Sequence, residues 1–352
     1  LRSYKHRFNK TSAMYPNFYN IQRLLTRYGM STYVAFGNLG NLLTIAVFAQ
    51  ARQRRNSCSL YLLIMTICNL ICLDIGILPI IFSLDYTDIR TKYEIACKLQ
   101  FYIRHASFQM MRTCKVLACF DRYALSSMSV RIRAFSQYKI AVRLIFITGL
   151  FWSLFIIQFA SKRSIKNQLC SIHNHFYTLI YTIYYLFFAG IIPPLLILIF
   201  SFLLMKNLKQ MRTHIQSQSP SRKTTITILR KRDRDLMRMV LIEVLFYFIN
   251  TMPFSIFLIY RILTKDHIKN KEQKQIELFI NYMTQSFLMY FNTVLPFFIY
   301  VSTSSSFRRK LTNIFKKLTR SMLKQRAKRF ISTAQQHEID IRLHLLKIDN
   351  TE

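Results

Sequence analysis

The sequence predicts an all-α membrane protein, a seven-transmembrane helix bundle with a short amphipathic eighth helix. Three observations lead to this fold class. Of the 352 residues, 52% are hydrophobic, yet 50 Lys and Arg against 15 Asp and Glu give a formal net charge of +35. The mean hydropathy is nevertheless +0.19. The charges also fall in separate segments between apolar blocks. A soluble nucleic-acid-binding protein would not carry such apolar blocks, so no nucleic acid is expected as a partner.

Six blocks are long and apolar enough to cross a bilayer, which takes about 20 helical residues. In chain order they are Ser31–Gln50, Leu60–Leu84, Ala141–Ala160, Phe176–Met205, Leu236–Tyr260 and Ile276–Val301. A further segment, Cys97–Phe120, has the length of a span but carries four Lys and Arg residues. Since charges at membrane depth usually face a bundle interior, we predict it as the third of seven spans, enclosed by the others. The alternative is a surface helix outside the bilayer.

The distribution of Lys and Arg around the spans predicts the topology. With the N-terminus outside, the basic clusters at residues 52–55, 122–139, 206–238 and 308–320 lie inside. We therefore expect a multi-pass protein of the plasma membrane. The parts are an extracellular N-terminal tail (1–30), the seven-transmembrane bundle (31–301), an amphipathic membrane-surface helix (302–323) and a cytoplasmic tail (324–352). A sequon at Asn9 fits a glycosylated extracellular tail.

Beyond the last span, apolar residues recur at helical spacing while Lys and Arg fill the opposite face. The apolar positions are Phe307, Leu311, Ile314, Phe315, Leu318 and Met322. This pattern predicts a helix that lies on anionic inner-leaflet lipid.

Two features frame the charged third span. Asp121-Arg122-Tyr123 stands at its inner end, and Cys97 stands at its outer end. Cys170 lies between the fourth and fifth spans, whereas the other five cysteines fall within spans or on the inner side. Cys97 and Cys170 are the two cysteines expected on the extracellular side, so they can form one disulfide bridge in an oxidising compartment.

Further residues accompany this frame in order along the chain: Gly40-Asn41, Trp152, Pro193 or Pro194, Pro253 and Pro296. Together they resemble the rhodopsin-like (class A) G-protein-coupled receptors, from roughly Ser31 to Met322. The resemblance implies a receptor that is not an enzyme, needs no cofactor, binds an extracellular ligand and activates a heterotrimeric G protein. By composition the chain resembles small neuropeptide receptors of invertebrates.

In this family the arginine at Arg122 pairs inwardly in the silent state and contacts the G protein in the active state. Asp121 beside it and Asp233 at the base of the sixth span are the available carboxylates. We therefore expect Asp121, Arg122, Tyr123 and Asp233 to form the coupling region, with Arg122 and Asp233 holding spans three and six together. The alternative is a solvated surface pair, worth at most about 1 kcal/mol.

The sequence departs from the family pattern at its switch positions. Asn69 replaces the acidic residue midway along the second span, so no bound sodium ion and no other metal is expected. The tryptophan before Pro253 is missing, so a switch in the sixth span would use a different side chain, such as Tyr247. In the seventh span Pro296 is kept, but its asparagine is lost and Tyr300 lies one residue late.

Two ionisable residues lie deep in spans three and six. Lys115 is seven residues before Arg122, about 10 Å along the helix, and Glu243 is ten residues before Pro253. In this family these two levels face each other, so we predict a buried Lys115–Glu243 ion pair that outward motion of the sixth span must break. The alternative is that both are neutral or face separate water pockets.

The ligand pocket is expected near Arg104, at the level where amine receptors of this family keep an aspartate. A cation at that place favours a carboxylate, a sulfate or an acidic peptide side chain. His105, Tyr181 and Tyr185 are expected to line the same pocket. Two alternatives remain: Arg104 pairs with Asp74, or the tyrosines are interfacial.

Other functional classes find less support. Enzyme motifs such as HExxH and GxSxG are absent, and the seventh span has no lysine for an opsin chromophore. A transporter with the charged third helix lining its path is the main rival, although no internal repeat or glycine-broken helix is found. A decoy receptor that does not couple to a G protein is the other.

Overall fold

The computed structural model describes residues 16–51, 55–166, 169–215, 223–264, 267–317 and 319–325. They belong to two compact units. The first ends at Ser305 and contains the helix bundle, and the second begins at Ser306. Residues 305–317 and 319–325 are helical, which overlaps the range 302–323 predicted for the amphipathic helix but extends two residues past its end. Asn9 and the tail from residue 326 onwards lie outside the described residues.

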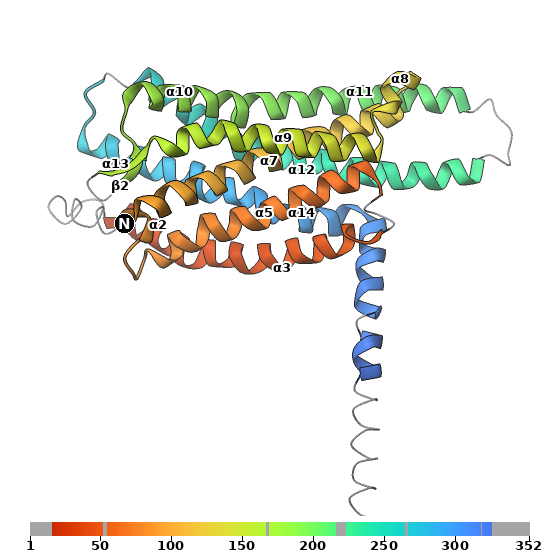
Figure 1. Ribbon diagram of the computed structural model, residues 1–352, viewed down its shortest axis with the longest axis horizontal. Coiled ribbons are helices and arrows are strands. Elements are labelled where there is room, and N and C mark those ends of the chain that lie inside the picture. Colours follow the sequence, from red (N-terminus) through yellow and green to blue (C-terminus); the bar gives the residue numbers. More distant parts are fainter. Residues whose placement is uncertain are drawn as a thin grey trace, which may run out of the picture. The chain divides into compact units, whose positions relative to one another are not determined.

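Seven long helical segments run through the first unit, and shorter elements connect them (Figure 1). The long segments are α2–η1–α3 (Pro16–Leu24, Leu25–Met30, Ser31–Phe48), α5 (Ser57–Phe82), α7 (Glu94–Ser126), α9 (Tyr138–Ser161), α10–η2–α11 (His175–Tyr185, Leu186–Ile191, Ile192–Ile215), α12 (Lys223–Leu263) and α13–η4–α14 (Lys271–Asn281, Tyr282–Leu288, Met289–Thr303). The short elements are α6 (Ile89–Lys92), α8 (Val130–Ala134), β1 (Arg163–Lys166) and β2 (Leu169–Ile172). This arrangement confirms the predicted all-α bundle of seven helices.

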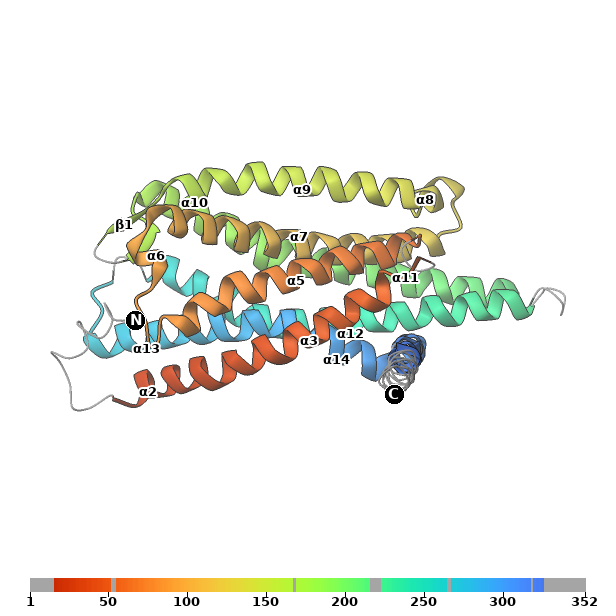
Figure 2. The ribbon, with the colours of Figure 1, turned by 60° about the horizontal axis from the view of Figure 1, so that its bottom comes forward.

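Six of the long segments are apolar enough to be membrane spans within the described part of the chain, and α7 is the exception because of its charges. Figure 2 shows α7 between α9 and α5. It also packs against α11 and α12. Its 33 residues reach about 50 Å. The central position explains how a helix with so many cations is accommodated, since its neighbours shield it from lipid.

The two ends of the bundle carry different short elements (Figure 1). At one end, called here the hairpin end, β1 and β2 form an antiparallel hairpin with Ile165 opposite Cys170. At the other, called here the α8 end, α8 connects α7 to α9. Asn56 caps the start of α5 here by accepting a hydrogen bond from the Ser59 amide at 3.3 Å.

The first helical segment of the described residues begins at Pro16, well before the predicted start of the span at Ser31. Gln22, Arg23 and Arg27 are good helix formers, so the helix continues beyond the apolar block that hydropathy detects. The residues predicted as an extracellular tail are therefore partly helical. Hydropathy marks the part of a helix suited to lipid and not the whole helix.

Side chains sort by polarity around the bundle. On α9, the large apolar side chains of Phe146, Leu150 and Leu154 are exposed, as expected for a lipid-facing surface. All five cysteines outside the disulfide, by contrast, are buried between helices: Cys58, Cys68, Cys72, Cys114 and Cys119.

Candidate functional site

The hairpin is fixed to the bundle by the predicted bridge between Cys97 and Cys170, which is present with a Cα–Cα distance of 5.8 Å. Cys97 lies in the first turn of α7, and Cys170 lies in β2. Arg163 of β1 is held at the same place. Its Nη2 donates to the Cys170 carbonyl, its Nε donates to the Cys170 sulfur at 3.4 Å, and its guanidinium lies 4.3 Å from the centre of the Phe101 ring.

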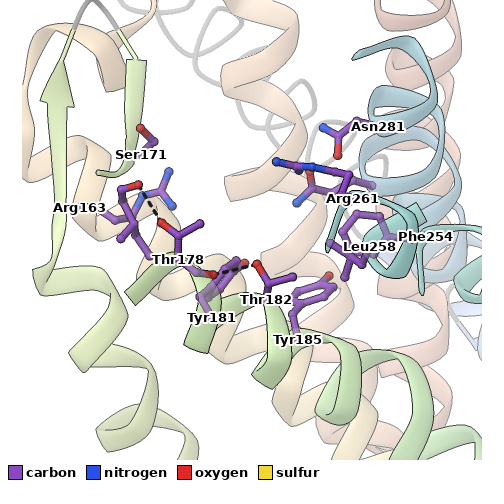
Figure 3. A pocket seen from close by; sticks show the side chains of 12 residues that line it. Arg163, Ser171, Thr178, Tyr181, Thr182, Tyr185, Phe254, Leu258, Arg261 and Asn281 are labelled. Carbon is purple, nitrogen blue, oxygen red and sulfur yellow. Dashed lines mark hydrogen bonds between the residues drawn. The ribbon is translucent and has the colours of Figure 1, made fainter. Parts of the chain in front are cut away.

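A cavity of about 180 Å³ opens beside this hairpin (Figure 3). The hairpin, α10, α12, α13 and η4 all contribute to it. Its lining residues are Arg163, Ser171, Ile172, Thr178, Tyr181, Thr182, Tyr185, Phe254, Leu258, Arg261, Asn281 and Gln285. The wall thus combines aromatic rings and hydroxyl groups with two guanidinium groups.

The charge of this lining is entirely positive, because it contains Arg163 and Arg261 but no Asp or Glu. Neither arginine forms an ion pair with a carboxylate of the described residues. Burial lowers the pKa of Arg163 to about 10, and the neighbouring Arg104 and Arg90 act in the same direction. The group therefore stays charged at neutral pH, in surroundings that screen its charge poorly.

The four residues predicted for the pocket divide between this cavity and the layer below it. Tyr181 and Tyr185 line the cavity. His105 and Arg104 do not line it. His105 donates from Nδ1 to the Phe101 carbonyl at 3.1 Å, and its Nε2 lies 2.5 Å from the Tyr181 hydroxyl.

Arg104 turns toward α14 instead of the cavity. Its Nη1 donates to the Tyr290 hydroxyl at 3.4 Å. The alternative partner Asp74 accepts a hydrogen bond from Asn38 at 2.7 Å and forms no ion pair with Arg104. The positive wall of the cavity is therefore formed by Arg163 and Arg261. In the sequence, the only sign of this role is that both arginines lie at the outer ends of their spans.

A second buried arginine, Arg112 of α7, was missed as a functional candidate, although the sequence shows it as a charge in the third span. It is 2% exposed. Its guanidinium donates to the Tyr247 hydroxyl at 3.0 Å, the Gln109 carbonyl oxygen at 3.1 Å and the Tyr185 hydroxyl at 3.4 Å. Within the described chain, no carboxylate pairs with it. Tyr185 thereby joins the cavity to the centre of the bundle.

Tyr247 of α12 connects three helical segments. Besides accepting from Arg112, its hydroxyl donates to the Ala189 carbonyl at 2.7 Å. That carbonyl lies in the π-helix η2, where the donors of an α-helix or a π-helix would be Pro193 or Pro194, neither of which has an N–H. The tyrosine hydroxyl therefore satisfies a carbonyl that its own helix leaves free.

Closer to the α8 end, Lys115 and Glu243 meet as a buried ion pair. The Lys115 Nζ lies 2.8 Å from the Glu243 Oε1, and the two side chains are 3% and 4% exposed. Tyr300 of α14 donates to the Glu243 Oε2 at 2.7 Å. The Lys115 ammonium also lies 5.0 Å from the centre of the Tyr247 ring. Spans three, six and seven therefore share one cluster of charged and polar groups.

The predicted coupling region lies at the α8 end of α7. Arg122 donates to the neighbouring Asp121 carboxylate, with Nη2 at 2.6 Å, and also to Asn56 at 3.4 Å. Asp121 accepts a further hydrogen bond from Ser136 at 2.9 Å. Tyr123 stacks on the ring of Phe200. Asp233 lies in α12, but its side chain is outside the described part, so its relation to Arg122 stays a prediction.

The remaining switch positions lie in the helix interiors. Pro253 and Pro296 lie inside α12 and α14, which continue as helices through both prolines. Asn69 is fully buried, and neither atom of its amide group has a hydrogen-bond partner in the described chain.

Comparison with known proteins gives one match. A protein-family model described as 7 transmembrane receptor (rhodopsin family) matches residues 40–300. This range runs from Gly40 in α3 to Tyr300 in α14 and covers most of the chain. A search of curated proteins finds no match.

Proposed function

Because the chain belongs to the rhodopsin family of seven-transmembrane receptors, we propose that it binds an extracellular ligand with an acidic group and activates a heterotrimeric G protein. Proteins of this family are receptors and not enzymes. The observation that carries the choice of ligand is the cavity lining, which holds Arg163 and Arg261 but no carboxylate. Cations in a partly buried wall favour an anionic ligand and disfavour an ammonium ligand. An acidic peptide, as the resemblance to neuropeptide receptors suggests, meets this requirement.

The proposed location is the plasma membrane, with the hairpin end and the N-terminus outside. The disulfide supports this orientation, since such bridges persist in oxidising compartments. Arg131, Arg133 and Lys139 near the α8 end support it as well, because basic residues concentrate on the cytoplasmic side. Asn9 is then available for glycosylation. The basic and apolar faces of residues 302–323 would lie on anionic inner-leaflet lipid.

For transmission, we propose that ligand binding moves the α8-end half of α12 away from α7. The contacts that oppose this motion are the Lys115–Glu243 pair and the hydrogen bond from Tyr300. Their opening would release Arg122 from Asp121, and from Asp233 if that pair forms, for contact with the C-terminal helix of Gα. Tyr247, Pro253 and Pro296 would set the path of this motion. His105 and Tyr181 would transmit the position of the ligand to α7.

The test is a cell reporter with a promiscuous Gα subunit, screened with pools of acidic, neutral and basic peptides. We expect a response to acidic pools, and we expect Arg122→Ala to abolish it at unchanged surface expression. Exclusive responses to basic pools would contradict the ligand class. No nucleotide exchange with any Gα would indicate a decoy receptor, and electrogenic or tracer flux would indicate a transporter.

A further inference from the structure

We infer that the cavity at the hairpin end binds a dicarboxylate group that also carries an adjacent N–H donor. This inference rests on the proposed receptor function and names the chemical class of its ligand. An N-acylated acidic amino acid and an acidic residue at the C-terminus of a peptide share this chemistry.

One wall of the cavity presents a guanidinium group that is already fixed in position. Arg163 uses Nε and Nη2 for the Cys170 sulfur and carbonyl, and its guanidinium carbon lies over the Phe101 ring. Its Nη1 makes no hydrogen bond to the described chain. Since the side chain is already ordered and largely desolvated, an anion that reaches Nη1 meets a preorganised donor. The low local dielectric strengthens this attraction.

The wall opposite is formed by α12 and presents Arg261 (Figure 3). The carboxylate of Glu277, which interacts electrostatically with Arg261, already binds the Lys269 Nζ at 2.6 Å and the Tyr260 hydroxyl at 2.9 Å. Arg261 therefore has no ion-pair partner among the residues described. A monocarboxylate compensates one of the two arginines, whereas two carboxylates on one ligand compensate both.

A third group in the lining is a hydrogen-bond acceptor, so its partner on the ligand must be a donor. The Oδ1 of Asn281 is buried without a hydrogen-bond partner in the described chain, and Asn281 lies beside Arg261 in Figure 3. Buried polar atoms are nearly always satisfied, so this oxygen calls for an N–H or O–H group. An ionised carboxylate has no proton to donate. The ligand must therefore carry a donor close to its acidic groups.

The size of the cavity limits how much of a ligand it encloses. Its volume of about 180 Å³ is close to that of an engineered cavity that holds one benzene molecule, about 150 Å³. It accepts one acidic amino-acid unit, while the rest of a longer peptide would remain outside. Tyr181, Tyr185, Phe254 and Leu258 offer apolar surface to the methylene groups between the two carboxylates.

The experiment measures thermal unfolding of the full chain, purified in lipid nanodiscs, with N-acetylglutamate, N-acetylglutamine and glutarate at constant ionic strength. N-acetylglutamate has two carboxylates and an N–H, N-acetylglutamine lacks one carboxylate, and glutarate lacks the N–H. We expect saturable stabilisation by N-acetylglutamate, with apparent affinity at least tenfold higher than for either analogue. A peptide ending in glutamate that binds at least tenfold more tightly than N-acetylglutamate would identify a peptide as the source of this group. Equal binding would identify the small acid.

Variants locate the site. Arg163→Gln and Arg261→Gln should each weaken N-acetylglutamate binding at least tenfold. Asn281→Leu should remove the preference for N-acetylglutamate over glutarate and leave glutarate binding unchanged. Lys162→Gln is the matched control, since Lys162 neighbours Arg163 but faces Tyr177 outside the lining. Arg261→Gln changes an exposed side chain, so it serves if Arg163→Gln fails to fold.

The inference is overturned if none of the three compounds stabilises the wild-type protein, if N-acetylglutamine binds as well as N-acetylglutamate, or if Arg261→Gln binds like the control. Because the readout is binding alone, it does not depend on a G protein. Binding without nucleotide exchange would refute the proposed coupling and support this site. Exchange triggered by a ligand without carboxylates, at wild-type levels in Arg261→Gln, would do the reverse.

Discussion

Arg112 and Tyr247 share a hydrogen bond of 3.0 Å in the middle of the bundle, from the arginine Nε to the tyrosine hydroxyl. The same hydroxyl donates to the Ala189 carbonyl at 2.7 Å. One oxygen atom therefore joins α7, η2 and α12. Since the guanidinium stays protonated even when buried, it needs every acceptor that its neighbours supply, and these are phenols, an amide and a thioether.

Tyr247→Phe is expected to destabilise the bundle by about 2–6 kcal/mol. The change leaves two buried groups unsatisfied, the Arg112 Nε–H and the Ala189 carbonyl, at about 1–3 kcal/mol each. In an Arg112→Met background only the carbonyl is left without a partner, so the same change should cost about half as much. Unfolding titrations of the four proteins in mixed micelles measure this double-mutant cycle. Additive effects would show that the two side chains are not coupled.

Lys115→Glu and Glu243→Lys should each lower the free energy of unfolding by about 3–5 kcal/mol, because each leaves like charges buried together. The doubly exchanged protein should recover more than half of that loss. Surface expression and unfolding titrations of the single and double variants provide the comparison. If the double variant is no better folded than either single one, the buried pair does not hold α7 and α12 together.

Tyr300→Phe should raise basal nucleotide exchange on the coupled G protein several-fold without ligand. The variant removes the hydrogen bond to the Glu243 carboxylate, and hydrogen bonds to charged groups contribute about 1.5–3 kcal/mol. Losing it favours separation of α12 from α14. Tyr290→Phe serves as the control, because Tyr290 lies on the same helix but contacts Arg104 instead. Equal basal rates in wild type and Tyr300→Phe would rule out this role for Tyr300.

Gly76→Ala should destabilise the protein by about 1–3 kcal/mol through overpacking. A Cβ atom at Gly76 would collide with the hydroxyl and ring of Tyr290. Gly149 is a matched control, since a Cβ atom there meets nothing within 4 Å. Gly149→Ala should leave stability unchanged or raise it by up to about 1 kcal/mol, the helix propensity difference. Thermal unfolding of both variants in one detergent makes the comparison, and equal losses would contradict it.

The enclosed position of the third span could be predicted from the sequence because a charge at membrane depth is costly unless it faces the bundle interior or a water-filled cavity. The juxtaposition of Lys115 and Glu243 was also accessible, since helical rise fixes the depth of each residue along its span. Both inferences use distances along a single helix. The family resemblance then supplied which helices face each other.

The direction of each arginine could not be predicted in the same way. Arg104 turns to Tyr290 and Arg112 to Tyr247 because of helix rotation and side-chain packing, which depth does not specify. The role of Arg163 depends on how the hairpin folds over the bundle. Short antiparallel strands in a loop rich in polar residues leave little periodic signal. These positions emerge only when all helices are assembled.

The burial of all five thiols outside the disulfide makes the protein suited to site-directed labelling. A cysteine introduced on the exposed surface would react with a membrane-impermeant maleimide, while the native thiols stay shielded by packed helices. Spectroscopic probes can therefore be attached to the water-exposed ends of α9 and α12 without first replacing the native cysteines. Distances between such probes would report on movements of single helices in the unaltered core.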